Sequence, residues 1–181
     1  MLKKPKRMTV LNTNKVRLSS PIEFDSVVNG DGLRIVIWFQ GCLFACPGCH
    51  NQDTWAIDEG FTMEIEDLLE EIESSLHKHV DGITLSGGDP MFQSSALKIL
   101  VPRLKDLGLN IWMYSGEIYE NLLKDKDFQL IKDYLDVIVD GRFVESKKDL
   151  TLDYRGSSNQ RLIDVQKTIA ENKIIQYKRH S

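Results

Sequence analysis

Cysteine placement is the feature that most constrains this chain. The 181-residue sequence has three cysteines, Cys42, Cys46 and Cys49, and all of them lie within one stretch of eight residues. Gly41 and Gly48 make this stretch compliant, so three thiolates can ligate one face of a small inorganic cluster. An iron-sulfur cube has four irons, and electron-carrier clusters normally use four cysteines. The spacing therefore predicts a cluster with one open iron, where a ligand can bind and react.

Three simpler interpretations compete with this one. A structural zinc site can be built from three cysteines and His50, although zinc motifs usually come as two separated pairs. The segment from Cys46 to His50 also matches the haem-attachment pattern C-x-x-C-H, which requires export, and we expect no signal peptide. A chance cluster of buried cysteines is the third interpretation. A zinc-binding module or a simple electron carrier stays open as the alternative from another class of protein.

The spacing Cys42-x-x-x-Cys46-x-x-Cys49 resembles the signature of the radical S-adenosylmethionine enzymes. The string from Gly41 to Asn51 is similar to that of the subgroup that activates glycyl-radical enzymes. This resemblance implies that the three cysteines are the metal ligands and catalytic residues of a [4Fe-4S] cluster. It also implies that S-adenosylmethionine chelates the open iron and is cleaved by one electron to a 5'-deoxyadenosyl radical.

Composition limits the class of protein. With 41% apolar and 28% charged residues, the chain suits one globular domain with a sizeable core. We expect a flexible basic tail over residues 1–15 and a single domain over 16–181. A net charge of -4 and the absence of a basic stripe argue against a nucleic-acid partner.

The environment of the protein follows from two further observations. The longest apolar run, Ile35 to Phe39, is too short to span a bilayer, so we expect no membrane partner. An odd number of cysteines in a single motif argues against a disulfide scaffold and for the reducing cytoplasm.

The pattern of apolar residues predicts an α/β fold. The expected strands are 33–39, 83–86, 109–113 and 135–139, with a short strand at 162–165. The expected helices are 62–79, one that starts at Ser94 or Ser95, and one or two broken helices over 117–134. This alternation lays the strands parallel, so we expect an open partial (β/α) barrel with a mainly parallel sheet. Loops at the carboxyl ends of the strands would form the site, beside a lateral opening for a macromolecular substrate.

The loop after the second expected strand is suited to ligand binding. Gly87 and Gly88 let the backbone approach a ligand closely, and the carboxylate of Asp89 suits an ammonium group. Ser86-Gly87-Gly88-Asp89-Pro90 resembles the motif that holds the amino group of S-adenosylmethionine in the family. We expect a side chain at Gly88 to occupy space that the ligand needs and to leave the thiolates untouched.

Other residues are assigned to the cofactor by the same resemblance. Gly48 and His50 flank Cys49, where the family contacts the nucleoside. Many relatives have an aromatic residue at one of those positions, so His50 is either the stacking partner or a hydrogen-bond donor. Ser115 either meets the carboxylate or ribose of the ligand or belongs to an ordinary turn. Asp140 is assigned mainly to structure.

The substrate is suggested by several motifs together. The stretches 86–90, 137–143 and 154–161 resemble the activating proteins of anaerobic (class III) ribonucleotide reductase, and the resemblance covers roughly residues 22–165. It implies a glycyl radical generated on the large reductase subunit, with an electron donor such as a flavodoxin or ferredoxin. Activation of pyruvate formate-lyase is the closest alternative. A small-molecule enzyme, such as a deazapurine-forming synthase, is a further one.

Overall fold

The computed structural model describes residues 14–179, and the expected basic tail falls mostly outside them. Strand β1 begins at Lys15, the last residue of that expected tail. The strands are β1 (Lys15–Leu18), β2 (Glu23–Ser26), β3 (Arg34–Phe39), β4 (Phe61–Glu64), β5 (Gly82–Gly87), β6 (Asn110–Ser115), β7 (Val137–Asp140) and β8 (Arg161–Asp164). The α-helices are α1 (Ile65–Ser75), α2 (Ser94–Asp106), α3 (Tyr119–Leu122), α4 (Lys126–Ile131) and α5 (Val165–Glu171).

These strands form one mixed sheet with a parallel centre. Its order is β4-β1-β3-β5-β6-β7-β8, and β2 pairs with β3 off this path. The pairs β3–β5, β5–β6 and β6–β7 are parallel, whereas all pairs that involve β1, β2, β4 or β8 are antiparallel. Neighbouring parallel strands therefore follow chain order, as in a segment of a (β/α) barrel. The expected α/β class and the parallel central strands are confirmed.

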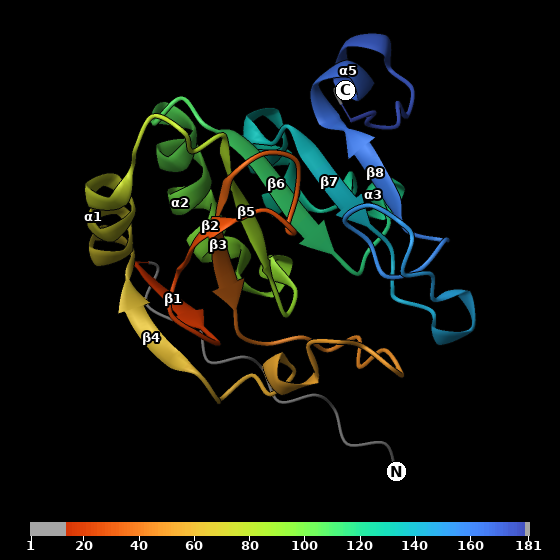
Figure 1. The fold of residues 1–181 in the computed structure, drawn as a ribbon, viewed down its shortest axis with the longest axis horizontal. Coiled ribbons are helices and arrows are strands. Elements are labelled where there is room, and N and C mark those ends of the chain that lie inside the picture. Colours follow the sequence, from red (N-terminus) through yellow and green to blue (C-terminus); the bar gives the residue numbers. More distant parts are fainter. Residues whose placement is uncertain (1–13, 180–181) are drawn as a thin grey trace.

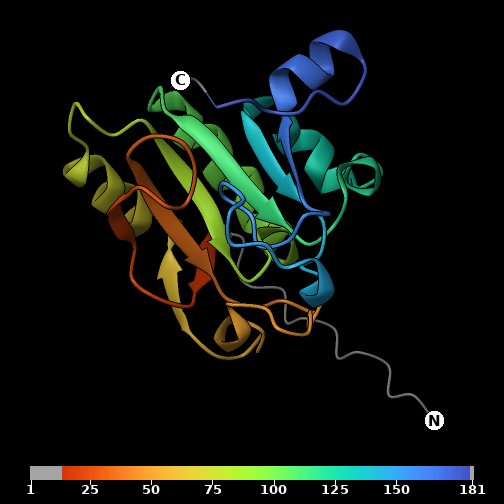
Figure 2. The ribbon, with the colours of Figure 1, turned by 45° about the vertical axis from the view of Figure 1, so that its right-hand side comes forward.

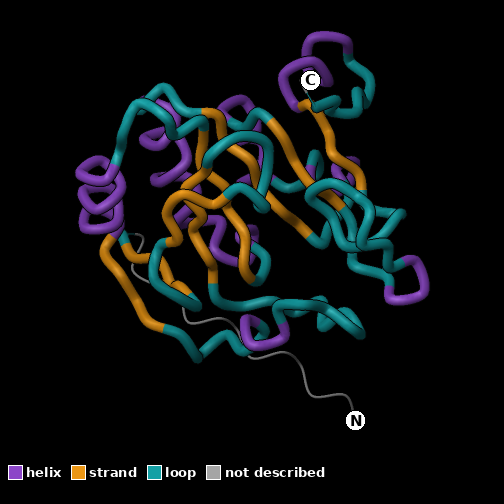
Figure 3. The backbone as a smooth tube through the Cα atoms, in the orientation of Figure 1, coloured by secondary structure: helices purple, strands orange, loops and turns teal. Residues whose placement is uncertain are grey.

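The two faces of the central sheet carry different cores, because successive side chains of a strand point to opposite faces. On one face, Ile111 and Met113 of β6 belong to a large apolar cluster with residues of α1, α2 and α4. On the other face, Trp112 packs with Val137, Val139 and Leu162 in a smaller cluster. Figure 3 shows the helices in purple and the strands in orange. The helices thus bury one face and leave the other to loops and the C-terminal segment.

Two expectations about the elements need correction. The expected helix 62–79 begins only at Ile65, because residues 61–64 pair with β1 along their whole length as strand β4. Thr62 therefore lies in a strand and does not cap a helix. The short strand expected at 162–165 exists as β8, but it runs antiparallel to β7. The expected broken helices over 117–134 are confirmed as α3 and α4, followed by a short 3-10 turn over Lys132–Tyr134.

The buried side chain of Arg34 connects the amino ends of the parallel strands β3, β5 and β6 by hydrogen bonds. Arg34 is 1% exposed, and its Nε donates to Thr84 Oγ1 at 2.7 Å. Its Nη2 donates to the backbone oxygens of Ile83, at 2.7 Å, and Asn110, at 3.1 Å, while Nη1 donates to that of Asp31 at 3.0 Å. A buried charge needs such partners. One side chain thus binds residues of β3, β5 and β6 together.

The carboxyl ends of the parallel strands point to a common edge. In Figures 1 and 2 the arrowheads of β3, β5 and β6 face the region that the orange segment after β3 crosses. That segment carries the three cysteines, between the end of β3 and the 3-10 turn at Gln52–Thr54. The expected placement of the cysteine motif at the carboxyl edge of the sheet is therefore observed.

Candidate functional site

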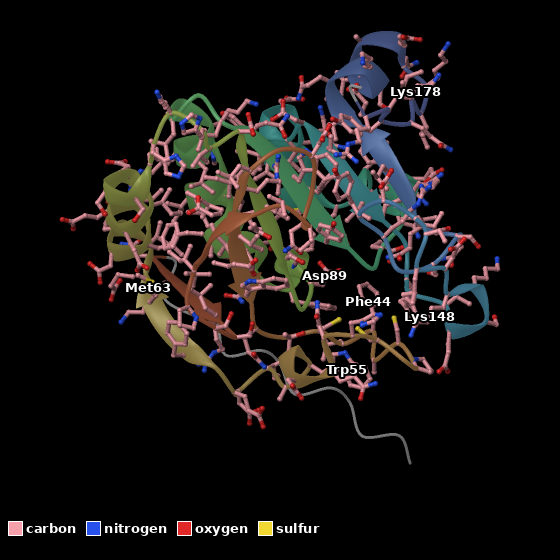
Figure 4. All side chains as sticks on the ribbon, viewed as in Figure 1. Phe44, Trp55, Met63, Asp89, Lys148 and Lys178 are labelled. Carbon is pink, nitrogen blue, oxygen red and sulfur yellow. The ribbon has the colours of Figure 1, made fainter. Side chains whose placement is uncertain are left out.

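A cavity of about 120 Å³ with a mouth open to solvent lies at this edge of the sheet. All three cysteines line it, together with residues from the loops after β5, β6 and β7. Figure 4 shows side chains of Phe44, Trp55 and Asp89 in this region, with sulfur atoms in yellow. The lining comprises Cys42, Phe44, Cys46, Cys49, Asn51, Thr54, Trp55, Ser86, Gly87, Gly88, Asp89, Tyr114, Ser115, Gly116, Gly141, Phe143 and Gln160.

Backbone hydrogen bonds hold the cysteine loop, which we define as residues 41–51. Its start is fixed because Gly41 N donates to Thr54 O at 2.7 Å and Cys42 N donates to Trp55 O at 3.1 Å. Its tip turns because Cys49 N donates to Cys46 O at 3.1 Å. Gly41 and Gly48 have φ of 104° and 73°, in the left-handed region that favours glycine. The loop therefore presents its three thiols from a defined backbone.

The thiols lie in a partly dry environment. All three are half-buried and make no disulfide. Burial raises the pKa of Cys42 to about 11, and burial also raises the pKa of Cys46. The backbone N–H of Asn51 approaches Cys49 Sγ at 3.4 Å, as a donor would toward a thiolate. Cluster binding, which needs deprotonated thiols, would therefore release protons here.

The donor set is compatible with an iron-sulfur cluster. Among residues 14–179, no three His, Cys, Asp or Glu side chains converge closely enough to hold one metal ion. The three cysteines nevertheless face one cavity. A cube places its irons at separate corners, so its thiolates need not converge on one point as four zinc ligands must. The chemistry and spacing of these donors thus fit an iron-sulfur cluster.

The glycine loop after β5 is docked directly on the cysteine loop. Gly88 N donates to Phe39 O at 2.8 Å, and Asp89 N donates to Gly41 O at 3.0 Å. A Cβ added at Gly88 would overlap the backbone oxygen of Gly41 and lie 2.8 Å from its carbonyl carbon. The expectation that a side chain at Gly88 leaves the thiolates untouched is therefore wrong, because it would push the cysteine loop.

Asp89 organises the next loop as well as its own. The residue is only 2% exposed. Its Oδ2 accepts hydrogen bonds from Ser115 Oγ at 2.9 Å and from Gly116 N at 2.8 Å. Its Oδ1 accepts one from Met91 N at 2.9 Å. Burial raises the pKa of Asp89, against the effect of these donors. The structure thus brings Asp89 and Ser115, both expected to meet the ligand, into contact with each other at the cavity wall.

Gly48 and His50 lie beside the cavity and not in its lining. A Cβ on Gly48 would meet the carboxyl carbon of Glu145 at 2.9 Å. The ring of His50 makes an edge contact with Phe143, with ring centroids 6.2 Å apart. Asp140 is fully buried in an ion pair with Arg161, and its Oδ2 accepts from Tyr119 N at 2.7 Å, which agrees with a structural assignment.

Sequence reasoning missed several residues at the cavity. Phe44, Tyr114, Phe143 and Gln160 all line it. The ring of Phe44 packs on Gly116 and lies 5.5 Å from the ring of Phe92. Only the position of Phe44 between two cysteines could have identified it, because the other contacts depend on long-range loop docking.

Comparison with known proteins agrees with this geometry. The profile of the family described as "4Fe-4S single cluster domain" matches residues 28–163, so the site belongs to an iron-sulfur protein with one cluster. The anaerobic ribonucleoside-triphosphate reductase-activating protein of Vibrio cholerae is 39% identical over 141 residues, which cover 74% of this chain and 89% of that protein. The phage T4 protein of the same name is 38% identical over 142 residues, or 75% and 86%. The chain belongs to the family of anaerobic ribonucleoside-triphosphate reductase-activating proteins.

The likeness to a solved structure is weaker. The crystal structure of QueE from Escherichia coli matches 57% of this chain and 54% of that one, with 20% identity and a TM-score of 0.49. Within residues 14–179, no helix is both long and apolar enough to cross a membrane.

Proposed function

We propose that this chain is a radical S-adenosylmethionine activase that generates a glycyl radical on an anaerobic ribonucleotide reductase. The observation that carries the proposal is that Cys42, Cys46 and Cys49 face one cavity with the Gly87-Gly88 turn. When bound and reduced, the cluster would supply one electron for the reductive cleavage of S-adenosylmethionine, for hydrogen abstraction from a glycine of the reductase. Family membership supports the reductase as the partner.

The residues of the chain bind, orient and shield. Cys42, Cys46 and Cys49 would hold three irons. The backbone at Gly87 and Gly88 would lie against the amino end of S-adenosylmethionine, and Ser115 against another polar group of it. Apolar walls from Phe44 and Phe143 would limit the access of water. A reactive radical requires this shielding. Hydrogen abstraction needs no general base, so the cavity can function without one.

The setting follows from the chemistry. Reduced iron-sulfur clusters are oxygen-sensitive, so we place the protein in the reducing cytoplasm with a flavodoxin or ferredoxin as the electron donor. Neither a nucleic acid nor a membrane is part of this proposal. Activation of pyruvate formate-lyase is the alternative to be tested against it.

A radical-transfer assay tests the proposal. The anaerobically reconstituted protein is mixed with S-adenosylmethionine, a reductant and the reductase from the same organism, and electron paramagnetic resonance should detect a glycyl radical on the reductase. Reductase labelled with deuterium at the glycine α-carbon should transfer deuterium into 5'-deoxyadenosine. The control offers pyruvate formate-lyase under identical conditions. A signal on the lyase and none on the reductase would overturn the partner, and absence of both iron and S-adenosylmethionine binding would overturn the enzyme.

A further inference from the structure

The segment after β7, residues 141–145, contributes Gly141 and Phe143 to the lining of the cavity that the three cysteines also line. Phe143 shares the lining of this cavity with Cys46 and Cys49. The ring of Phe143 meets His50 edge-on at 6.2 Å. The ring contact places the segment against the cysteine loop next to its third cysteine, Cys49.

Two further contacts extend along the same segment. The guanidinium carbon of Arg142 lies 4.6 Å from the ring centroid of Phe44, a cation–π geometry. At the other end, the Glu145 carboxyl packs against the backbone of Gly48. Residues 142–145 therefore touch the cysteine loop from Phe44 to His50, along most of its length.

Residues 156–160, here called the polar string, form hydrogen bonds with the backbone of this segment. Asn159 Nδ2 donates to Arg142 O at 2.8 Å. Gln160 Nε2 donates to Gly141 O at 3.0 Å. The backbone N–H of Val144 donates to Ser157 Oγ at 3.2 Å. Three residues of the polar string thus bind three backbone groups of residues 141–144, which belong to neither a helix nor a strand.

Hydrogen bonds within the polar string fix its own conformation. Gln160 Oε1 accepts from Gly156 N at 3.0 Å and from Ser157 N at 3.1 Å, which closes the string into a tight turn. A Cβ on Gly156 would lie 3.0 Å from the ring of Phe143, so glycine leaves the room that the ring occupies. The polar string therefore has room for the Phe143 ring because residue 156 has no side chain.

We infer that residues 156–160 are a positioning element for the cluster: they hold segment 141–145 against the cysteine loop, and Asn159 and Phe143 act in series in this contact. Neither residue is a metal ligand. Outer partners of this kind restrain the geometry of ligands, and their loss commonly weakens metal binding by roughly 10- to 100-fold. The inference rests on the proposed cluster but not on the identity of the protein substrate.

The first test measures cluster retention in Asn159→Ala. The reconstituted variant should contain a full complement of iron but lose it to a chelator roughly 10-fold faster than the unsubstituted protein, with altered electron paramagnetic resonance of the reduced cluster. The matched control is Gln166→Ala, because Gln166 Nε2 also donates to backbone oxygens, those of Leu135 at 2.6 Å and Asp133 at 3.0 Å, at a site remote from the cavity.

Global stability separates positioning from a general loss of structure. Asn159 Oδ1 is buried without a hydrogen-bond partner in the part of the chain that the structure describes. Removing the side chain therefore also removes an unpaired acceptor, and the net cost to folding should be small. The Tm of the metal-free Asn159→Ala protein should match that of Gln166→Ala. A much lower Tm for Asn159→Ala would show that Asn159 stabilises the whole fold and does not specifically position the segment. That result would overturn the inference.

A double-mutant cycle gives the decisive result. Phe143→Leu alone should also accelerate iron loss. If Asn159 acts through segment 141–145, the double variant with Asn159→Ala should lose iron much more slowly than the product of the two single effects predicts. Phe143→Leu with Gln166→Ala should give the simple product. Multiplicative effects for Asn159 and Phe143, or no effect of Asn159→Ala, would overturn the inference while leaving S-adenosylmethionine cleavage, and hence the proposed function, intact.

Discussion

Asn51 Nδ2 donates a hydrogen bond of 3.1 Å to the backbone oxygen of Gly87, which joins the end of the cysteine loop to the glycine loop. This bond links the residues expected to hold the cluster with those expected to hold S-adenosylmethionine. Asn51→Ala should therefore weaken S-adenosylmethionine binding roughly 5-fold, the equivalent of a net hydrogen bond of about 1 kcal/mol, without loss of iron. Calorimetry on the reconstituted protein measures this affinity.

The control for Asn51 is Asn29→Ala, which removes a hydrogen bond of 2.8 Å from Asn29 Nδ2 to Ser26 Oγ away from the cavity. Its affinity for S-adenosylmethionine should be unchanged. Equal affinities in both variants would show that the link between the two loops does not contribute to ligand binding.

Replacement of any one cysteine should disable the cluster. Cys42→Ser, Cys46→Ser and Cys49→Ser each remove a ligand to one iron, so turnover of S-adenosylmethionine should fall below about a hundredth of the unsubstituted value. Iron analysis and anaerobic assay of 5'-deoxyadenosine measure the two consequences. A serine variant that kept a full cluster and normal turnover would remove that cysteine from the ligand set.

His50 distinguishes the cluster from a zinc or haem site. His50→Ala should leave iron content nearly unchanged, because the ring of His50 contacts Phe143 and His50 does not line the cavity. Metal analysis after reconstitution provides the measurement. Loss of all metal in this variant would favour a Cys3His zinc site instead.

Gly88 couples the two loops sterically. Gly88→Ala would place a methyl group against the backbone oxygen of Gly41, so both iron content and S-adenosylmethionine affinity should fall. Gly108→Ala is a suitable control, because Gly108 has φ of 77° but no atom within 4 Å of an added Cβ. That variant should lose some stability from backbone strain and keep its iron. Full iron in Gly88→Ala would show that the cysteine loop moves aside at little cost.

Burial of Cys42 predicts a pH dependence in the metal-free protein. Because its pKa is raised to about 11, Cys42 is a thiol at neutral pH, and the reactive thiolate forms only as the pH rises toward that value. Site-resolved alkylation should therefore accelerate continuously from the ordinary thiol pKa of 9.0 up to about 11. A rate that levels off near 9 would mean that the thiol is exposed to solvent before the cluster is inserted.

The parts of the site that could be predicted from the sequence are those formed by residues close together in the chain. The cysteine spacing and the Gly87-Gly88 turn were both visible, and both line the cavity. Strand β4 was missed because Thr62 resembles a helix cap, and only pairing with β1, more than 40 residues earlier, makes this segment a strand. Contacts such as that between Asn159 and Arg142 were hidden for the same reason, since they form only when distant loops dock.

Arg34 has a consequence for how the chain reaches its native state. Its Nε binds Thr84 Oγ1, and a slip of β5 by a single residue would turn the Thr84 side chain to the other face of the sheet. The guanidinium would then lose one of its buried hydrogen-bond partners, at a cost of about 1.5–3 kcal/mol. Arg34 thus favours the native alignment of β3 and β5, and the position of the cysteine loop, which follows β3, depends on that alignment.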